Sequence, residues 1–391
     1  MTTKFKLAAI ALACTSAFNA SAAVELYNND EGMTFSADGL INIFYSNSDT
    51  DSTDAGGNTT NSKQSRVKTG FLPSYIGFNF ANQVGDYKVA TRSSFWVTLS
   101  DTDTFRDASP ADSGTGTAID IRQFYATVSG DFGEVLFGKD FGLFNRSNIM
   151  GDELLIGYGQ TSGGLADAGV VSFGNISTGY TYPFPKAQIT YRSPDMSGFK
   201  LAVGIMDPSK LDSTPLNPND AAATNSDEES PRFEAELEYN TTFDEGSFKA
   251  FVSGVSQSTK SVTSGDQDQT GVGYGVNVKF SGVSLSASGF SAEGIGALDQ
   301  ILTDESIESD GYLVQASYTM GDNRFVLSYG ETETDDGATK ATNSNSNISY
   351  FRTVIPGVTL VAELNKTESD NNQTSVAEEN NVFSIGAVVT F

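Results

Sequence analysis

The side chains that most often carry out catalysis are nearly missing from this sequence. Its 391 residues include no His and a single Cys, at position 14. Without His there is no Ser–His–Asp triad, no Cys–His pair, no His-ligated zinc and no His general base. Most enzyme chemistry is therefore excluded, and we expect no enzymatic activity. The charged groups that remain are carboxylates, Lys and Arg.

Carboxylates dominate the charge. The chain has 49 Asp+Glu against 23 Lys+Arg, a formal net charge of −26. A nucleic-acid partner is excluded, because phosphate binding needs a Lys/Arg surface. Acids cluster at 101–107, 227–229 and 331–336. Such clusters could bind Ca²⁺ or Mg²⁺, but we favour a solvated acidic surface, no cofactor and a mild preference for cations.

The first 22 residues have the pattern of a secretory signal peptide. Lys4 and Lys6 precede an apolar run over 7–14, and Ala20-Ser21-Ala22 forms an A-x-A cleavage site. A lipoprotein signal at Cys14 is the alternative, for which Ala11 is a poor match. Cleavage after Ala22 leaves one domain, 23–391, without Cys and with a net charge of 21 − 49 = −28. No later run of about 18 apolar residues predicts a transmembrane helix.

The rest of the chain alternates between apolar and polar residues, as β-strands with two different faces do. The alternation is clear in 33–45, 231–241, 310–320, 323–330 and 383–391. Several of these segments run about ten residues, the length of a tilted strand across a bilayer, whereas soluble strands average about five or six.

Short and long connections also alternate along the chain. Short turns are predicted near 82–86, 130–133, 193–198, 243–246, 281–283, 320–323 and 355–357. Long polar loops are predicted near 46–70, 100–117, 141–182, 207–230, 257–269, 292–309, 331–345 and 368–380. Seven turns and eight loops join sixteen strands, although 14 or 18 strands remain compatible with the sequence. The fold class is all-β, an antiparallel transmembrane barrel with short periplasmic turns and long extracellular loops.

The alternation also predicts which charged residues face the lumen. Lys88 and Arg92 lie opposite an apolar face of Tyr87, Val89 and Phe95, and Lys186 lies opposite Ile189 and Tyr191. A ring of charge in a pore sets ion preference through its local potential. The alternative is that an inward Lys or Arg only avoids lipid, where it would cost about 2–4 kcal/mol. The face opposite Arg122 carries Gln123 and Thr127, and their polarity suggests an oligomer contact.

The chain resembles the general porins of Gram-negative bacteria over its whole mature length. The stretch that carries the resemblance is 121–133 (IRQFYATVSGDFG) with 136–139 (LFGK). Residues 73–78 (PSYIGF) resemble the second-strand motif, and 189–194 (ITYRSP) resemble the strand that leaves the third loop. Phe391 matches the terminal aromatic residue of such barrels.

The resemblance implies a trimeric diffusion channel in the bacterial outer membrane, surrounded by lipid and lipopolysaccharide. It implies that the third loop, 141–182, folds into the pore and sets acids against basic residues of the wall. Arg122 matches the wall Arg, and Asp152 and Glu153 are the matching loop acids. The second-strand Arg and the usual loop signature are not matched here. We therefore expect a constriction formed by Arg92, Arg122, Lys186, Lys88, Asp152 and Glu153, whose basic side chains could reverse the cation preference.

Passive diffusion of ions and small hydrophilic solutes is the function we expect. The alternatives are a porin selective for an oligosaccharide or an organic anion, marked by an aromatic track in the lumen, and a non-conducting outer-membrane anchor or adhesin. A barrel enzyme is disfavoured because such enzymes typically need His.

Overall fold

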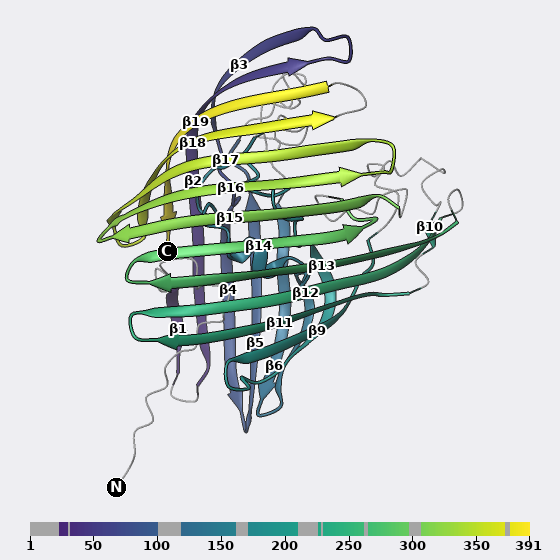
Figure 1. Cartoon of the computed structure of the whole chain (residues 1–391). Coiled ribbons are helices and arrows are strands. Elements are labelled where there is room, and N and C mark those ends of the chain that lie inside the picture. The colour runs from purple at the N-terminus through teal and green to yellow at the C-terminus, as the bar shows by residue number, and fades with distance from the viewer. Residues whose placement is uncertain are drawn as a thin grey trace, which may run out of the picture.

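The chain forms a closed antiparallel β-barrel (Figure 1). The computed structural model describes residues 23–29, 32–100, 119–161, 171–209, 226–227, 230–261, 265–296, 306–371 and 376–391. Its strands are β1 (Val24–Asn28), β2 (Thr34–Thr53), β3 (Thr59–Lys68), β4 (Ser74–Val84), β5 (Tyr87–Val97), β6 (Asp120–Gly130), β7 (Gly133–Phe141), β8 (Pro185–Arg192), β9 (Phe199–Met206), β10 (Ser226–Asp227), β11 (Arg232–Phe243), β12 (Gly246–Ser261), β13 (Gly265–Phe280), β14 (Val283–Glu293), β15 (Glu308–Met320), β16 (Asn323–Asp335), β17 (Lys340–Ile355), β18 (Val358–Asn371) and β19 (Val376–Thr390).

Sixteen of these positions form the barrel wall. Strands β3 and β4 both pair with β2, so they act as one strand interrupted at 69–73, while β1 and β10 are short additions. Counting β3 and β4 as one strand and leaving out β1 and β10 reduces the nineteen strands of the sheet to sixteen. The predicted strand count is confirmed, and all seven predicted short turns connect consecutive strands.

The barrel closes where β19 pairs with β2 along Ala377–Thr390. Phe391 continues this closure, since its backbone exchanges two hydrogen bonds with Gly39, of 2.8 and 3.1 Å. The Phe391 ring lies where a Cβ on residue 39 would stand, 2.4 Å away, so Gly at position 39 allows the last residue to seal the seam. A closed sheet leaves no unpaired edge in lipid.

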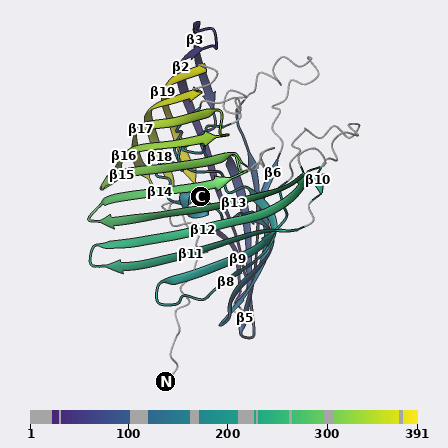
Figure 2. The same cartoon turned by 45° about the vertical axis from the view of Figure 1, so that its right-hand side comes forward.

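The wall is higher on one side than on the other. Strands β4 to β9 have 8–11 residues, whereas β12, β13 and β17 have 16 and β2 has 20. The long strands β11 to β19 run across the view in Figures 1 and 2, whereas the short strands β5 and β6 run steeply behind them. Four predicted loops, 46–70, 257–269, 331–345 and 368–380, were therefore wrong in extent, because strands occupy most of them. Both faces of these extensions are polar, so the alternation on which the prediction depended is lost there.

The two faces of the wall differ as a bilayer requires. Outward residues are apolar and exposed, for example Leu327 at 56% and Ile348 at 59%. Inward residues of the same strands are mostly polar and buried, for example Ser328 and Asn347. The predicted outward positions Ile189 and Tyr191 and inward positions Gln188 and Arg192 follow this pattern on β8. Within the described residues, no helix is long and apolar enough to cross a membrane.

Candidate functional site

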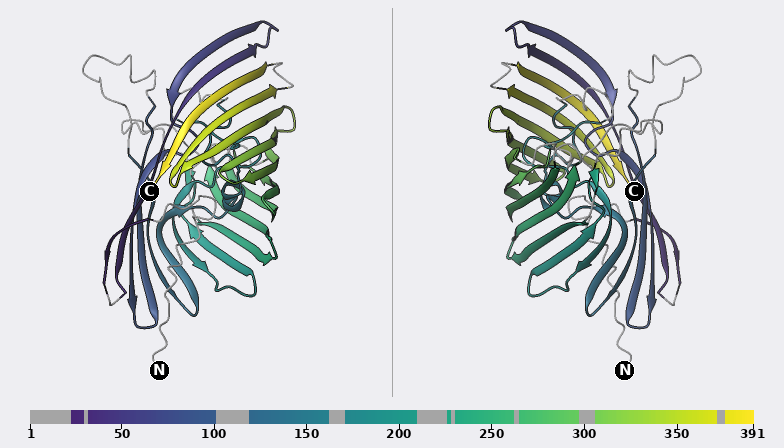
Figure 3. Two further views of the ribbon diagram at one scale, coloured as in Figure 1. Left: turned by 90° about the vertical axis from the view of Figure 1, so that its left-hand side faces the viewer. Right: turned by 90° about the vertical axis from the view of Figure 1, so that its right-hand side faces the viewer.

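The connection between β7 and β8 folds into the barrel, as predicted for the third loop. We call residues 142–184 the constriction loop; 142–161 and 171–184 are described. The loop lies between the two sides of the wall in Figure 3. Its hydrogen bonds reach β11, β12, β15, β18 and β19 through Glu234, Ser253, Gln315, Glu363 and Asn380. The loop is therefore held against the half of the inner wall that β11 to β19 form.

Two carboxylates of β11 hold the start of the loop. The amides of Leu143 and Phe144 donate to Glu234 Oε2 at 2.5 and 2.8 Å, and the Ser147 amide donates to Glu236 Oε1 at 3.2 Å. These amides lead into the single described helix, α2 (Arg146–Met150), whose first N–H groups have no acceptor within the helix. The wall supplies an acceptor for one of these, the Ser147 amide, and both carboxylates are buried.

Asp152 holds the middle of the loop. Its carboxylate accepts hydrogen bonds from the Leu154 amide, the Asn175 amide and side chain, the Tyr180 hydroxyl at 2.6 Å and Gln315 on β15 at 3.0 Å. Burial raises the pKa of the Asp152 carboxyl, while its hydrogen-bond donors act in the opposite direction. Burial and the adjacent carboxyl also raise the pKa of Tyr180. Asp152 thus joins the outgoing and returning parts of the loop to β15.

Glu363 of β18 holds the far end of the loop. It accepts the amides of Tyr158 and Gly159 at 3.0 and 2.9 Å, and the Asn347 side chain at 3.2 Å. A Cβ at Gly157 would lie 2.0 Å from Glu363 Oε1, so this close approach requires Gly. Phe71, in the segment that interrupts the β3/β4 strand, donates its amide to the Gly157 carbonyl at 3.0 Å.

Apolar contacts strengthen these anchors. Two buried clusters join loop side chains to inward side chains of the long strands. One contains Phe144, Ile149, Leu155, Ile176, Tyr180, Val255, Phe290 and Leu313, and the other Leu154, Tyr158, Phe44, Val326, Phe351, Val361 and Val382. Burying such side chains stabilises by about 1.5–3 kcal/mol each. The loop is consequently a packed lining of this half of the barrel.

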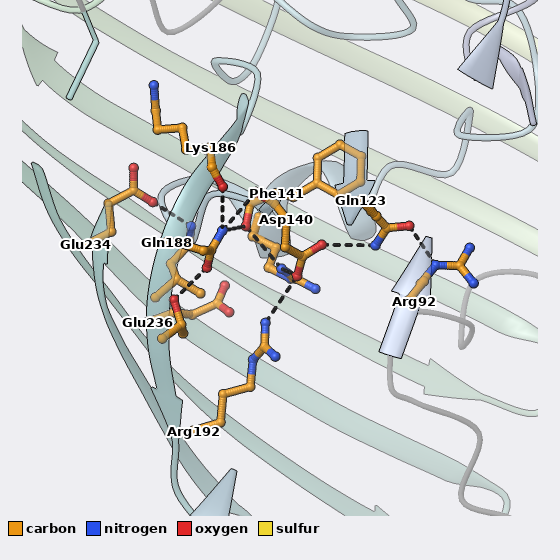
Figure 4. A network of polar contacts seen from close by, with 12 residues as sticks. Arg92, Gln123, Asp140, Phe141, Lys186, Gln188, Arg192, Glu234 and Glu236 are labelled. Atoms are coloured by element: carbon orange, nitrogen blue, oxygen red, sulfur yellow. Dashed lines mark hydrogen bonds and ion pairs between the residues drawn. The ribbon is translucent and has the colours of Figure 1, made fainter. Parts of the chain in front are cut away.

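The short strands carry a charged network that extends to the start of the loop (Figure 4). Arg92 pairs bidentately with Asp38 at 2.8 and 3.1 Å, and its Nε donates to Gln123 at 2.8 Å. Gln123 donates to Asp140 at 2.9 Å, and Asp140 also pairs with Arg146 and Arg192 at 3.2 and 3.3 Å. Positive and negative groups alternate along the network, which links β5, β6, β7 and β8 to the start of the loop.

An aromatic row accompanies these charges. Tyr75 and Trp96 are stacked with centroids 4.4 Å apart, and Arg92 lies 5.9 Å from the Tyr75 ring. Arg122 lies between Trp96 and Tyr182, at 5.2 and 5.9 Å, and donates to the Tyr182 hydroxyl at 3.0 Å. Burial raises the pKa of Tyr182, while the Arg122 guanidinium acts in the opposite direction. Such cation–π contacts contribute about 0.5–2 kcal/mol. Arg122 thus ties the returning loop to β5.

The predicted orientation of β6 was wrong at two positions. Gln123 and Thr127 point inward and are buried, whereas Phe124 points outward and is 58% exposed. A bulge between Ser94 and Trp96 shifts the register of β5 against β6, and Arg122 reaches Trp96 next to the inward Gln123. Gln123 and Thr127 therefore form no polar outward face, and the oligomer contact loses the observation from which it was inferred.

The structure brings some of the candidate residues together and separates others. Arg92 and Arg122 meet at the Tyr75–Trp96 stack. Lys186 is buried, contacts Ser209 at 2.5 Å and lies 5.7 Å from the exposed Phe184 ring. Lys88 lies near the start of β5, close to a short turn.

The candidate loop acids lie away from these bases. Asp152 contacts β15, and Glu153 pairs with Arg324 of β16 at 2.5 Å. Strand β15 is seven steps from β5 one way around the sixteen-strand wall and nine steps the other way, roughly half of the barrel. Asp152 is only 3% exposed, so it serves the loop's own structure.

Sequence reasoning missed the wall residues that anchor the loop. Glu234 and Glu363 were not proposed as site residues, nor were Asp38, Asp140 and Arg324. The alternation in 231–241 places the acids of β11 on the lumen face, and a row of inward carboxylates was a usable signal. Nothing in the local sequence distinguishes Glu363, since its loop partners, Tyr158 and Gly159, lie more than 200 residues away in the chain.

Metal binding finds no support in the part of the chain that the structure describes, where no three acidic side chains are grouped closely enough to hold an ion. The acidic stretch 101–107 and most of 227–229 lie outside the described residues. In 331–336, Glu333 pairs with Lys340 and Glu331 accepts the Tyr329 hydroxyl.

The family comparison agrees with a channel-type barrel. The model described as Gram-negative porin matches residues 7–372. The chain belongs to the Gram-negative porin family. As a member of that family with this fold, it is an outer-membrane channel for passive diffusion rather than an enzyme.

Solved structures agree on the fold. The outer membrane channel DcaP of Acinetobacter baumannii is similar with a TM-score of 0.64 and 17% identity, over 93% of this chain and 99% of that one. The anion-selective porin from Comamonas acidovorans gives 0.60 and 15%, over 92% and 100%. OmpT of Vibrio cholerae in a trimer form gives 0.50 and 15%, over 90% and 99%. At these identities the likeness shows the fold alone. No curated protein matches the chain.

Proposed function

We propose that solutes cross this porin between the constriction loop and the inner face of the short strands β4 to β8. The observation that carries the proposal is the attachment of the loop to β11–β19 through Glu234, Gln315 and Glu363. Sixteen-stranded barrels enclose a lumen wide enough for water. The loop is fixed mostly to one half of the wall and meets the other half at Tyr182 and Gly157. It narrows the lumen and leaves the remaining cross-section to the solute.

The path would be bordered by Arg92 and Arg122 on one side and by Glu153 on the other. Their side chains are 16%, 20% and 14% exposed, so each reaches solvent. Charges facing one another across a narrow aqueous path select solutes by charge and dipole orientation. Lys88 and Lys186 would act nearer the two mouths, and Asp152 would act only by holding the loop.

Liposome swelling tests this function. Proteoliposomes holding the folded protein are transferred into isotonic solutions of uncharged sugars of increasing size. We expect swelling that falls steeply with sugar mass, as for a water-filled path limited by size. Equal rates for all sugars, or no swelling beyond that of liposomes with boiled protein, would contradict the proposal.

The assembly and processing of the protein are part of the same proposal. We infer a homotrimer, supported by the trimer form of OmpT, whose fold is similar. We infer contact with lipid and lipopolysaccharide around the apolar outer face, and export by a signal peptide cut after Ala22. Mass spectrometry of the native protein in detergent measures the number of subunits, the mass of the mature chain and any retained lipopolysaccharide. A monomer with residues 1–22 attached would contradict the first and last of these inferences.

A substrate-selective porin for aromatic anions is a second candidate. It is favoured by Phe184, whose side chain is 48% exposed and lies beside Lys186 and Tyr182. Tyr182 in turn contacts Arg122. An aromatic carboxylate could stack on the Phe184 ring with its charge near Lys186. Benzoate would then block chloride current more strongly than acetate at equal concentration. Equal effects of the two anions would reject this candidate.

A further inference from the structure

The charges of this acidic chain are unevenly distributed between the two faces of the wall. On the outer face of the high wall, Lys63, Lys340 and Lys366 are each paired with a carboxylate, from Asp49, Glu333 and Glu368 respectively. The inner face carries Arg and Lys on both sides of the lumen, including Arg92, Arg192, Lys249 and Arg324. The overall net charge of −26 therefore does not describe the surface that a permeating ion meets.

Three lysines stand at the periplasmic end of this inner face. Lys88, Lys200 and Lys279 are within two residues of a strand end that adjoins a short turn, on β5, β9 and β13. Each lysine shares its strand face with a neighbour that points inward. Lys88 shares it with Arg92, and Lys200 with the buried Ala202. Lys279 shares it with Asn277, whose side chain donates to the inward Ser284. Lys200 and Lys279 are exposed and Lys88 is half-buried. All three point toward the lumen.

No carboxylate neutralises these three lysines within the described part of the chain. None of them belongs to an ion pair, whereas four carboxylates of the inner face are each paired with an Arg or Lys, and the inward Glu236 instead accepts the Ser147 amide. Asp38 pairs with Arg92, Glu134 with Arg192, Glu238 with Lys249, and Glu153 with Arg324. Glu238, which stands opposite Lys200 in the ladder, is thus already occupied. The three lysines therefore add positive charge to the lower inner face that no ion pair neutralises.

The periplasmic turns themselves also carry acids. These are Asp86, Asp131, Asp195, Asp244, Glu245 and Asp322. They follow the ends of the strands, so they lie beyond the lumen rather than along its wall. Water and salt screen charges over about 8–10 Å at ordinary ionic strength, whereas a ring of like charge inside a low-dielectric wall focuses its field on the path. The lysines point into the lumen while the acids stand on turns in open water, so an ion inside the lower lumen meets the lysines first.

We infer that Lys88, Lys200 and Lys279 form an anion-attracting inner mouth, so that this porin passes small anions in preference to cations despite its acidic composition. The inference rests on the proposed function, because it needs an open lumen. Compact organic and inorganic anions, such as carboxylates and phosphate, are the solute class that this mouth favours. Acids such as Asp49, Glu333 and Glu368 lie on the other side of the wall, where they act on the outer surface.

The reversal potential of a single bilayer across a KCl gradient tests this inference. The variant K88Q/K200Q/K279Q removes three charges from the inner mouth. The matched control K63Q/K340Q/K366Q removes the same number from the outer face and leaves the lumen unchanged. Three unit charges about 10 Å from the path in water change the local ion concentration by about fivefold to tenfold before screening. The measurement is therefore made at low salt, where screening is weakest.

We expect the unaltered protein to prefer chloride over potassium. The inner-mouth variant should lower the chloride-to-potassium permeability ratio several-fold, and the outer-face control should leave it within about 20% of the original. A folded barrel that does not conduct refutes the proposed function and this inference with it. A conducting channel that prefers potassium, or whose ratio responds equally to both triple variants, refutes the inference while leaving the channel function intact.

Discussion

Replacing Glu363 with Ala should loosen the constriction loop without unfolding the barrel. The substitution removes the acceptor of two loop amides, Tyr158 and Gly159, and of the Asn347 side chain. A buried donor left without an acceptor costs about 1–3 kcal/mol, so two amides represent roughly 2–6 kcal/mol. Water entering from the lumen recovers part of this. A remaining loss of about 3 kcal/mol would raise the population of the detached loop end about 150-fold.

Single-channel recording measures that loosening. We expect larger and more variable conductance steps in Glu363→Ala, with frequent transitions between sublevels, because the loop end then leaves the wall and returns. Glu368→Ala is the matched control: Glu368 lies on the same strand, points outward and has a side chain that is 55% exposed. Both variants should still migrate differently on an electrophoresis gel before and after boiling, which marks a folded barrel. Steps of unchanged size and steadiness in a folded Glu363→Ala barrel would refute the anchoring role.

Three further substitutions test other parts of the account. Gly157→Ala places a Cβ 2.0 Å from Glu363 Oε1, so its recordings should resemble those of Glu363→Ala; recordings like those of the unaltered protein would contradict the close approach. Arg122→Gln removes the hydrogen bond to Tyr182 and the cation–π contact with Trp96, so we expect faster protease cleavage within the constriction loop. An unchanged cleavage rate would argue against a role of Arg122 in holding the loop. Leu327→Arg puts a charge on the lipid face at a cost of about 2–4 kcal/mol and should reduce the yield of folded barrel in a refolding assay. Ser344→Arg, on the polar extension of β17, should fold normally. Equal yields of the two variants would contradict the assigned membrane band.

Alternation predicted the membrane-crossing parts of the wall because lipid on one side and water on the other impose opposite polarity on neighbouring residues. The same rule could not predict the upper parts of β2, β12, β13 and β16 to β19, where both faces meet water. It was wrong at Gln123 because a bulge in the β5–β6 pairing interrupts the alternation, and a bulge leaves no mark in the sequence of either strand.

The candidate site was predicted less completely than the fold. Alternation placed Lys88, Arg92 and Lys186 on the inner face, and the resemblance to porins indicated that the loop after β7 enters the barrel. Neither could reveal that Arg92 is held by Asp38, or that Asp152 faces the loop's own interior. Arg92 and Asp38 are 54 positions apart in the chain, and Asp152 and Gln315 are 163 positions apart. Only the folded wall brings these residues together.

The most direct test of the central claim is the conductance of the purified, unboiled protein in a planar bilayer. The account predicts stepwise, long-lived openings whose conductance scales with salt concentration, because the loop lines one half of a water-filled lumen and leaves the other half open. A folded, heat-modifiable barrel that inserts into the bilayer and carries no current would contradict the account, since the loop would then close the lumen.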